Sequence, residues 1–148
     1  SFDETESFGG PDGSAGAPAE DAEAAMEAEK EPPVLNLEGR WFDAIKRGEK
    51  TVEGRLATPE KLRAAEEARE RGVVFVSGET GERLRVPVAG FRVFPGLEEY
   101  LEAEGLQNAL PGVGTVAEGA EVYLKFWGPE RVKEHGIVAL ELGPVPAA

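Results

Sequence analysis

The pattern of hydrophobic and polar positions divides the chain near Val34. Residues 1–33 are rich in Gly, Ala, Pro and Glu and hold few large apolar side chains, whereas apolar positions recur at regular spacings from Val34 onward. A segment with so little apolar surface to bury cannot offset the entropy cost of ordering it. We therefore predict a disordered acidic tail over 1–33, one folded domain over 34–142, and a short flexible C-terminus over 143–148.

The start of the domain carries strand and helix signals in turn. Val-Leu-Asn-Leu over 34–37 predicts a first strand, and residues 40–47 predict a short helix that turns Trp41 and Phe42 inward and stops at Gly48. Aromatic residues on so short a helix serve either as buried anchors or as stacking surfaces for nucleic-acid bases. The sequence favours the first interpretation and leaves the second open.

Residues 51–56 alternate with the period of a strand. Thr51, Glu53 and Arg55 share one face, while apolar residues and a glycine occupy the other. A strand with a polar face therefore follows the helix stop directly.

Three further helices are expected. One begins at the Thr-Pro pair that opens 59–71, and its thin apolar stripe is typical of a surface helix. In the second, apolar residues over 97–101 recur at helical spacing, and the next position on that stripe is Glu104, which must point toward the covered side. The third, over 116–127, follows a capping box at Thr115 and ends at a Gly-Pro pair.

β-Branched residues mark the remaining strands. Runs at 73–77 and 83–93 flank a hairpin loop, Pro87 makes the second of them bulged or an edge strand, and 136–142 closes the domain. His135, just before the closing strand, is interpreted as a turn residue. Strands connected by short helices favour an α+β fold, namely a small, partly open β-barrel with short flanking helices.

Composition excludes several function classes. The 148 residues include no cysteine and a single histidine, His135, so disulfides, thiol nucleophiles and the usual zinc sites are excluded. We expect neither a metal nor a cofactor. No apolar run approaches the roughly 20 residues that a membrane helix needs, so we expect no membrane partner, and we expect a monomer.

The net charge of −13 is concentrated at one end of the chain. Residues 1–33 hold ten acids and one lysine, a net of −9, and 12 of the remaining 15 bases lie between Arg40 and Arg92. Any nucleic-acid contact must therefore be local, because there is no broad basic surface. The acidic tail is either a solvating linker or an internal competitor for a basic cleft in the domain.

The start of the chain bears on its cellular location. It begins with Ser and has the profile of neither a secretory signal nor a transit peptide, so we expect a fragment or a processed chain. Cysteine usage leaves the compartment unknown. An intracellular protein, cytoplasmic or nuclear, is the expectation.

The most informative stretch is Gly-Glu-Lys-Thr-Val-Glu-Gly-Arg over 48–55. Lys50 is suited to hold an oxyanion or phosphate, Glu53 to accept hydrogen bonds from a base edge or an amine, and Arg55 to orient Glu53. The alternative is a surface strand with ordinary ion pairs, each contributing about 0 to 1 kcal/mol. Both interpretations treat Lys50 as an exposed residue.

Residues 41–55, WFDAIKRGEKTVEGR, resemble the signature of the ASCH domain family, a helix followed by G-x-K-x-x-E-x-R. Residues 94–112 look like the middle helix of that family and the segment after it, and residues 123–127 and 135–140 look like its closing helix and strand. The resemblance spans about 35–142. It implies a PUA-like β-barrel whose cleft, lined by the signature, binds RNA or a nucleotide.

The resemblance also raises the possibility of catalysis. Some small bacterial members of the family are amidohydrolases that deacylate N4-acetylcytidine with a Lys, a Thr three residues later and a Glu in the middle segment. Lys50 matches the Lys and Glu104 is the best match for the Glu, but Glu53 stands where the Thr nucleophile would be.

Two hypotheses follow. In the first, the domain is a binding module for RNA or a modified nucleotide, with Lys50, Glu53 and Arg55 lining the cleft and Lys46 and Phe126 as further ligand contacts. Phe126 lies off the apolar stripe of its helix and is expected to be exposed. In the second, it is an amidohydrolase acting on N4-acylated cytidine, or a related hydrolase, with Glu53 or Glu104 as general base and Lys50 stabilising the oxyanion.

Overall fold

A computed structural model describes residues 31–146. The predicted disordered tail lies outside the described residues except for 31–33, as do residues 147–148 of the predicted flexible C-terminus. In chain order the elements are β1 (Val34–Leu37), α2 (Gly39–Lys46), β2 (Val52–Leu56), α3 (Pro59–Arg71), β3 (Val73–Ser77), β4 (Arg83–Val86), β5 (Val88–Phe94), α4 (Leu97–Glu104), α5 (Leu106–Ala109), α6 (Val116–Leu124), α7 (Pro129–His135) and β6 (Ile137–Leu142).

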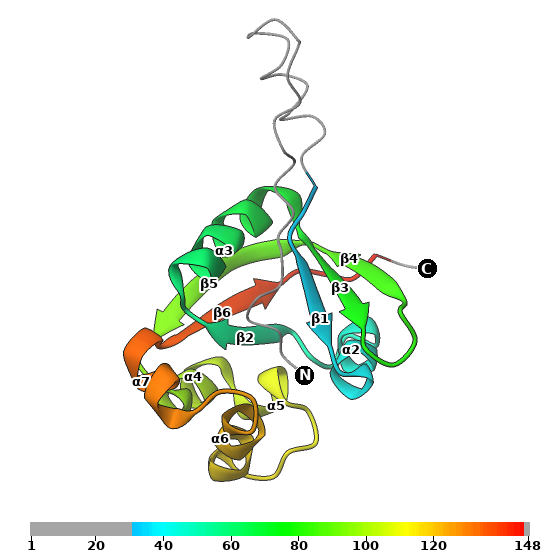
Figure 1. Ribbon diagram of the computed structural model, residues 1–148. Helices are drawn as coiled ribbons and strands as arrows, with labels where there is room; N and C mark the ends of the chain where they lie inside the picture. Colours follow the sequence, from blue (N-terminus) through cyan, green and yellow to red (C-terminus); the bar gives the residue numbers. More distant parts are fainter. Residues whose placement is uncertain (1–30, 147–148) are drawn as a thin grey trace, which may run out of the picture.

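The strands form two three-stranded sheets within this range (Figure 1). One sheet has the order β1-β3-β4, with β1 parallel to β3 and β4 antiparallel to it. The other has the order β2-β6-β5 and is antiparallel throughout. The predicted α+β class is confirmed, and residues 31–146 form no closed barrel.

Pro87 divides what the sequence predicts as one strand over 83–93. The part before it, β4, pairs with β3, and the part after it, β5, pairs with β6 in the other sheet. The expected edge position and bulge are confirmed, since β4 and β5 are each an edge strand of their sheet and the register shifts between Val88 and Gly90. The expectation of one continuous strand was wrong, because proline has no N–H to continue a ladder and its ring fixes φ. Val86 and Val88 are buried and Pro87 between them is exposed, so the chain passes from one sheet to the other at the surface, with the two valines turned inward.

The opposite edges of the two sheets, β1 and β2, are joined by a side chain. The guanidinium of Arg55 in β2 donates from Nη2 to the carbonyl oxygen of Asn36 in β1 at 2.7 Å. The sheets are therefore connected through the backbone at Pro87 on one side and through Arg55 on the other.

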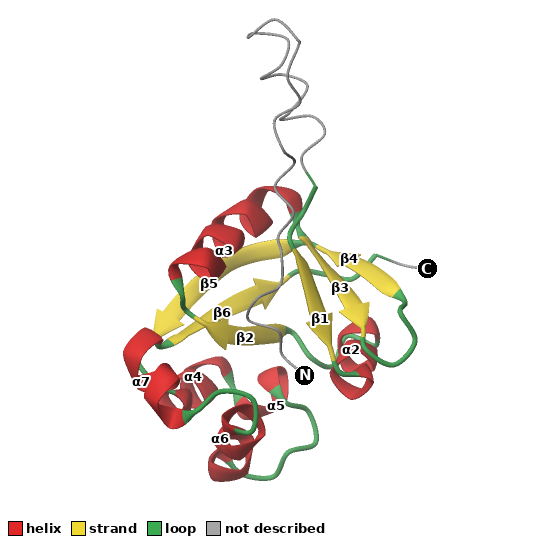
Figure 2. Cartoon of the chain, in the orientation of Figure 1, coloured by secondary structure: helices red, strands yellow, loops and turns green. Residues whose placement is uncertain are grey.

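Helix α2 packs against β3, and the other helices lie at two ends of the molecule (Figure 2). Helix α3 packs against β5 and β6, while α4 to α7 gather at the other end, with α4 against α5 and α6. The predicted start of α3 is confirmed, because Thr58 Oγ1 accepts from the N–H of Lys61 at 3.2 Å and Pro59 follows as the first helical residue.

The helix predicted over 116–127 is shorter than expected. The N-cap at Thr115 is confirmed, with Thr115 Oγ1 accepting from the N–H of Glu118 at 3.1 Å and donating to the Glu118 carboxylate at 3.2 Å, but α6 ends at Leu124. Pro129 then begins α7, because a proline is tolerated at the first helical position. His135 is the last residue of α7, so its interpretation as a turn residue was wrong.

Gly54 allows α4 to approach β2 closely. A Cβ on Gly54 would lie 2.5 Å from Tyr100 Oη and 2.6 Å from Tyr100 Cζ. The Tyr100 hydroxyl lies 2.8 Å from that of Tyr123, whose ring stacks on Trp127 with centroids 5.3 Å apart. All three aromatic residues are buried, so one buried aromatic row joins α4, α6 and the segment after α6 to the β2-β6-β5 sheet.

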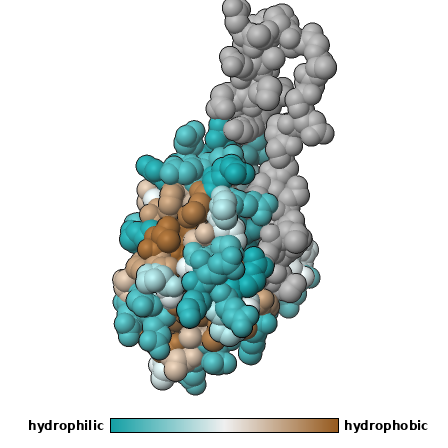
Figure 3. All heavy atoms as spheres, turned by 60° about the vertical axis from the view of Figure 1, so that its left-hand side comes forward, coloured by the Kyte–Doolittle hydropathy of each residue, from teal (hydrophilic) through white to brown (hydrophobic). Residues whose placement is uncertain are grey.

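The surface is mainly hydrophilic on the side of α3 and α7, with a limited apolar patch (Figure 3). Val93 of β5, 53% exposed, is the exposed large hydrophobic residue of the described range. No helix between residues 31 and 146 is long and apolar enough to cross a membrane.

Replacing Gly54 by Ala should lower the free energy of unfolding by about 1–3 kcal/mol, because the added methyl overpacks against the buried Tyr100 ring. Chemical denaturation measures the change. Gly90→Ala is the matched control in the same sheet, since a Cβ there meets nothing within 4 Å. Equal stability of the two variants would contradict the close packing of α4 on Gly54.

Candidate functional site

Lys50 is carried inward by the turn that ends α2. Gly48 adopts a φ of +82°, which favours glycine, and the N–H groups of Glu49 and Lys50 both donate to the carbonyl oxygen of Ala44, at 2.9 and 3.1 Å. The turn leads at once into β2 and leaves Lys50 only 2% exposed.

Three oxygens surround the ammonium of Lys50. Nζ donates to the carbonyl oxygens of Val52, at 2.7 Å, and Ala109, and it pairs with Glu53 Oε1 at 3.1 Å. The Trp41 ring lies 5.9 Å from Nζ. Since a lysine has three N–H donors, these oxygens use all of them. Lys50 therefore positions Glu53 and the end of α5, and a direct hydrogen bond to a ligand would require one of these three to break.

Glu53 lies between two cations. Its Oε2 accepts from Arg55 Nε at 2.7 Å, while Oε1 faces Lys50. All three residues are 2% exposed, so we call them the buried triad. Two cations and one anion give the triad a net charge of +1.

The burial of the triad corrects the sequence analysis. The expectation of an exposed Lys50, and the alternative of a surface strand with ordinary ion pairs, were both wrong. The reason is that every residue of β2 is buried: Tyr100 of α4 packs on Gly54, and α3 lies across a narrow pocket from Arg55.

The triad changes the acidity of its members. Burial alone would raise the pKa of the Glu53 carboxyl, but the charges of Lys50 and Arg55 and their hydrogen bonds outweigh burial and hold that pKa below its usual value. Burial lowers the pKa of the Lys50 ammonium, and Glu53 offsets this only in part. Glu53 is thus an ionised carboxylate, which accepts hydrogen bonds and donates none.

Arg55 also lines a narrow pocket of about 10 Å³, room for about one water molecule, between α3 and the strands. Lys61 of α3, 6% exposed, is the second cation in the pocket wall. Lys61 is not among the site residues predicted from the sequence. A signal was present, because Lys61 precedes Ala65 and Ala68 by four and seven positions and so shares the buried stripe of α3.

Glu104 is not brought to the triad. Both its carboxylate oxygens accept from Arg92, at 2.6 and 2.7 Å, and Arg92 also donates to Glu141 at 3.1 Å. Arg92 pairs with Ala139, which pairs with Gly54, so these side chains share one face of the sheet and Glu53 points to the other. As expected, Glu104 does point toward the covered side, with its side chain 5% exposed.

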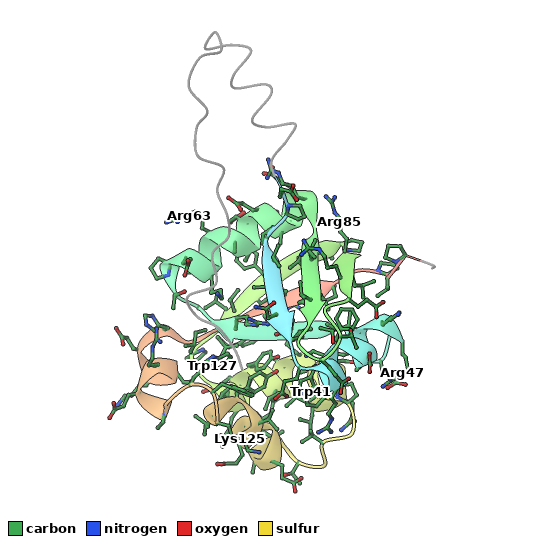
Figure 4. The ribbon with its side chains drawn as sticks, turned by 45° about the vertical axis from the view of Figure 1, so that its right-hand side comes forward. Trp41, Arg47, Arg63, Arg85, Lys125 and Trp127 are labelled. Atoms are coloured by element: carbon green, nitrogen blue, oxygen red, sulfur yellow. The ribbon has the colours of Figure 1, made fainter. Side chains whose placement is uncertain are left out.

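The remaining predicted contacts lie apart from the triad. Lys46 is exposed on α2 and pairs with Glu82 at 2.6 Å, on the loop between β3 and β4. Phe126 is partly buried and packs against the core rather than being exposed. Trp41 and Phe42, 3% and 0% exposed, are buried anchors, so the interpretation of them as stacking surfaces was wrong. Trp41 is labelled in Figure 4. No group of three or more His, Cys, Asp or Glu side chains in the described residues is placed to hold a metal ion.

The chain is similar to two solved structures. It shares 37% identity with hypothetical protein PH0355, known from a crystal structure, with a TM-score of 0.63 over 74% of this chain and 95% of that one. It shares 33% identity with protein PF0455 from Pyrococcus furiosus, known from a solution NMR structure, with a TM-score of 0.57 over 76% of this chain and 96% of that one. No family model and no curated protein matches the chain.

Replacing Lys50 by Ala should lower the free energy of unfolding by about 3–5 kcal/mol, because it leaves Glu53 with one cation and two buried carbonyls without their donor. Lys46→Ala, which breaks an exposed pair, is the matched control and should cost less than about 1 kcal/mol. Urea denaturation distinguishes them. A Lys50→Ala protein as stable as its control would mean that the triad is not buried in solution.

Proposed function

The chain belongs to the protein family of PH0355 and PF0455, and we propose that its domain is an ASCH-type binding module whose partly open, PUA-like barrel binds single-stranded RNA or a modified nucleotide. The strand arrangement supports this architecture. The two sheets follow one another as β1-β3-β4 and β5-β6-β2, are joined at Pro87, and leave β1 and β2 as facing edges bridged by Arg55. The binding site that we propose lies at this opening.

The buried triad is the observation that carries the proposal. Placing a net positive charge in a protein interior costs several kcal/mol per ion before its partners compensate. Perturbed pKa values produced by burial and a specific charge partner are concentrated at functional sites. The triad also coincides with the G-x-K-x-x-E-x-R signature. The residues whose burial is energetically costly are therefore the charged residues of that motif.

Each cation and the carboxylate have a distinct role in this proposal. Arg55 and Lys61, which line the pocket, contact a phosphate or a carbonyl oxygen of the ligand. Ionised Glu53 accepts from an N–H on a base edge, as offered by an exocyclic amine. Lys50 holds Glu53 in place. Because the domain has no broad basic surface, these few contacts supply the affinity.

Adding a short single-stranded RNA, or N4-acetylcytidine monophosphate, to ¹⁵N-labelled protein should shift the backbone amide signals of 53–55 and of 61–65. Amides of the loop at 79–82, on the far end of β3, serve as the internal control and should stay in place. Shifts confined to other elements would show that the ligand binds elsewhere on the domain. No shifts at millimolar ligand would exclude binding of these ligands.

Lys61→Met should weaken RNA binding, with little change in melting temperature because the side chain keeps its apolar length. Arg63→Met is the matched control, since Arg63 projects outward from the same helix (Figure 4). Two phosphate-binding cations give a slope of about −1.4 in a plot of log affinity against log salt concentration for a single strand. Fluorescence anisotropy measures both the affinity and its dependence on salt. Equal affinities in the two variants would show that Lys61 does not contact the RNA.

A second candidate function is an amidohydrolase acting on N4-acylated cytidine. The lowered pKa of Lys50 supports it, because lysines used in catalysis commonly have a pKa lowered by burial. Glu104 is engaged by Arg92, which leaves Glu53 as the base, and its lowered pKa makes it a weak one. If this function holds, chromatography of N4-acetylcytidine incubated with concentrated protein should reveal cytidine and acetate. Unchanged substrate would exclude this second function and leave ligand binding as the proposed function.

A further inference from the structure

A groove at the C-terminal end of α3 contains no member of the buried triad. It is open to the surface, has a volume of about 370 Å³, and is formed by the last turn of α3, the junction of β4 and β5, and Pro146. Its charged lining residues are three arginines and one glutamate, namely Arg69, Arg71, Arg85 and Glu70. Because cations outnumber anions in the wall, the groove is a candidate site for an anion.

The guanidinium of Arg85 is held in one orientation at this groove. Its Nε and Nη2 both donate to the carbonyl oxygen of Arg71, the last residue of α3, at 3.1 and 2.6 Å. A guanidinium has five N–H donors, so three remain, two on Nη1 and one on Nη2. These three lie on the edge that is not turned toward α3. Two parallel N–H groups on one edge are the geometry with which arginine binds a phosphate bidentately.

Arg85 has no carboxylate partner among residues 31–146, since both of its hydrogen bonds go to a neutral carbonyl. Arg83, two positions earlier on the same face of β4, is exposed and also forms no salt bridge within that range. Arg69 pairs with Glu66 at 3.2 Å, but both side chains are more than half exposed, and such a pair contributes little. Two unpaired guanidinium groups and one weakly paired group therefore lie close together.

The outer face of the β1-β3-β4 sheet connects this groove with the opening between β1 and β2. Arg85 pairs with Val74 of β3, and Val74 pairs with Val34 of β1, so the three side chains point to the same side. Neighbouring strands are about 4.8 Å apart, which places β4 about 10 Å from β1. A strand of RNA that leaves the opening across this face therefore meets Arg85 and Arg83.

We propose that Arg85, with Arg83 and Arg69 beside it, binds phosphates of a single-stranded RNA that extends beyond the opening between β1 and β2. Residues 34–148 carry a net charge of −4, because −9 of the total of −13 lies in residues 1–33, so the groove is a local cationic surface on an acidic domain. The two guanidinium groups on β4 are about 7 Å apart along the strand, which suits the regularly spaced phosphates of one chain. That the anion belongs to RNA rests on the proposed function, whereas the anion site itself does not.

Removing one guanidinium tests the contact. Arg85→Gln in the full-length chain should weaken the binding of an eight-residue oligocytidylate by about three- to tenfold and make the slope of log affinity against log salt shallower by about 0.7. Arg63→Gln is the matched control, because it removes the same charge from α3 outside the groove, and it should change both quantities little (Figure 4). Fluorescence anisotropy measures the affinity at several salt concentrations.

A second variant separates charge from geometry. Arg85→Lys keeps the charge but has no planar fork, so it should recover only part of the lost affinity. An oligouridylate of the same length should lose the same factor in Arg85→Gln, since a phosphate contact does not read the base. All affinities are measured below the melting temperature of each variant, because Arg85 also bonds to the end of α3. Equal affinities of wild type and Arg85→Gln, or equal losses in Arg85→Gln and Arg63→Gln, would overturn the inference.

Amide signals separate this inference from the proposed function. If both hold, the oligocytidylate should shift the signals of 53–55 together with those of Gly72 and Arg85. Shifts at 53–55 alone would overturn the inference and leave the proposed function, whereas shifts at Gly72 and Arg85 alone would support the groove and refute binding at the opening. A hexaglutamate peptide that shifts Gly72 and Arg85 at the same concentration as the RNA would overturn RNA as the occupant in favour of an acidic peptide.

Discussion

The Glu53 carboxylate, shared between Lys50 and Arg55, is the interaction on which the rest of the domain depends. Through Lys50 it is linked to the end of α5, because the same ammonium donates to the Ala109 carbonyl. Through Arg55 it is linked to β1, because the guanidinium donates to the Asn36 carbonyl. A single buried carboxylate therefore links strands of both sheets to α5. Losing either cation would leave buried polar groups unpaired.

This arrangement couples stability to ligand recognition. Glu53 and Arg55 are held in place by packing on both faces of β2, so the groups at the proposed binding site are already oriented before a ligand arrives. Preorganised groups lose less entropy on binding. Arg92 plays a comparable structural part on the other face, where it joins β5 to α4 through Glu104 and to β6 through Glu141.

Local signals in the sequence predicted the elements that depend on a few neighbouring residues. The Thr58 cap, the stop at Gly48 and the N-cap at Thr115 are each made within three or four positions, and all are present. The errors came where a boundary depends on distant partners. Pro87 separates two strands only because a second sheet is there to receive β5, and the predicted helix over 116–127 ends early as Pro129 begins another.

The sequence by itself determined most of the longer elements, the α+β class and the Lys50–Glu53–Arg55 spacing, because strand alternation and helix capping are set by adjacent residues. It did not predict the short helices α5 and α7 or the division of β4 from β5. Only the tertiary structure decided that these three charges are buried and which groups they meet. Ala109 lies 59 positions from Lys50, and Asn36 lies 19 from Arg55 in another sheet. It also separated Glu104 from the triad and added Lys61, because contacts between faces of a sheet and a helix depend on packing rather than on spacing along the chain.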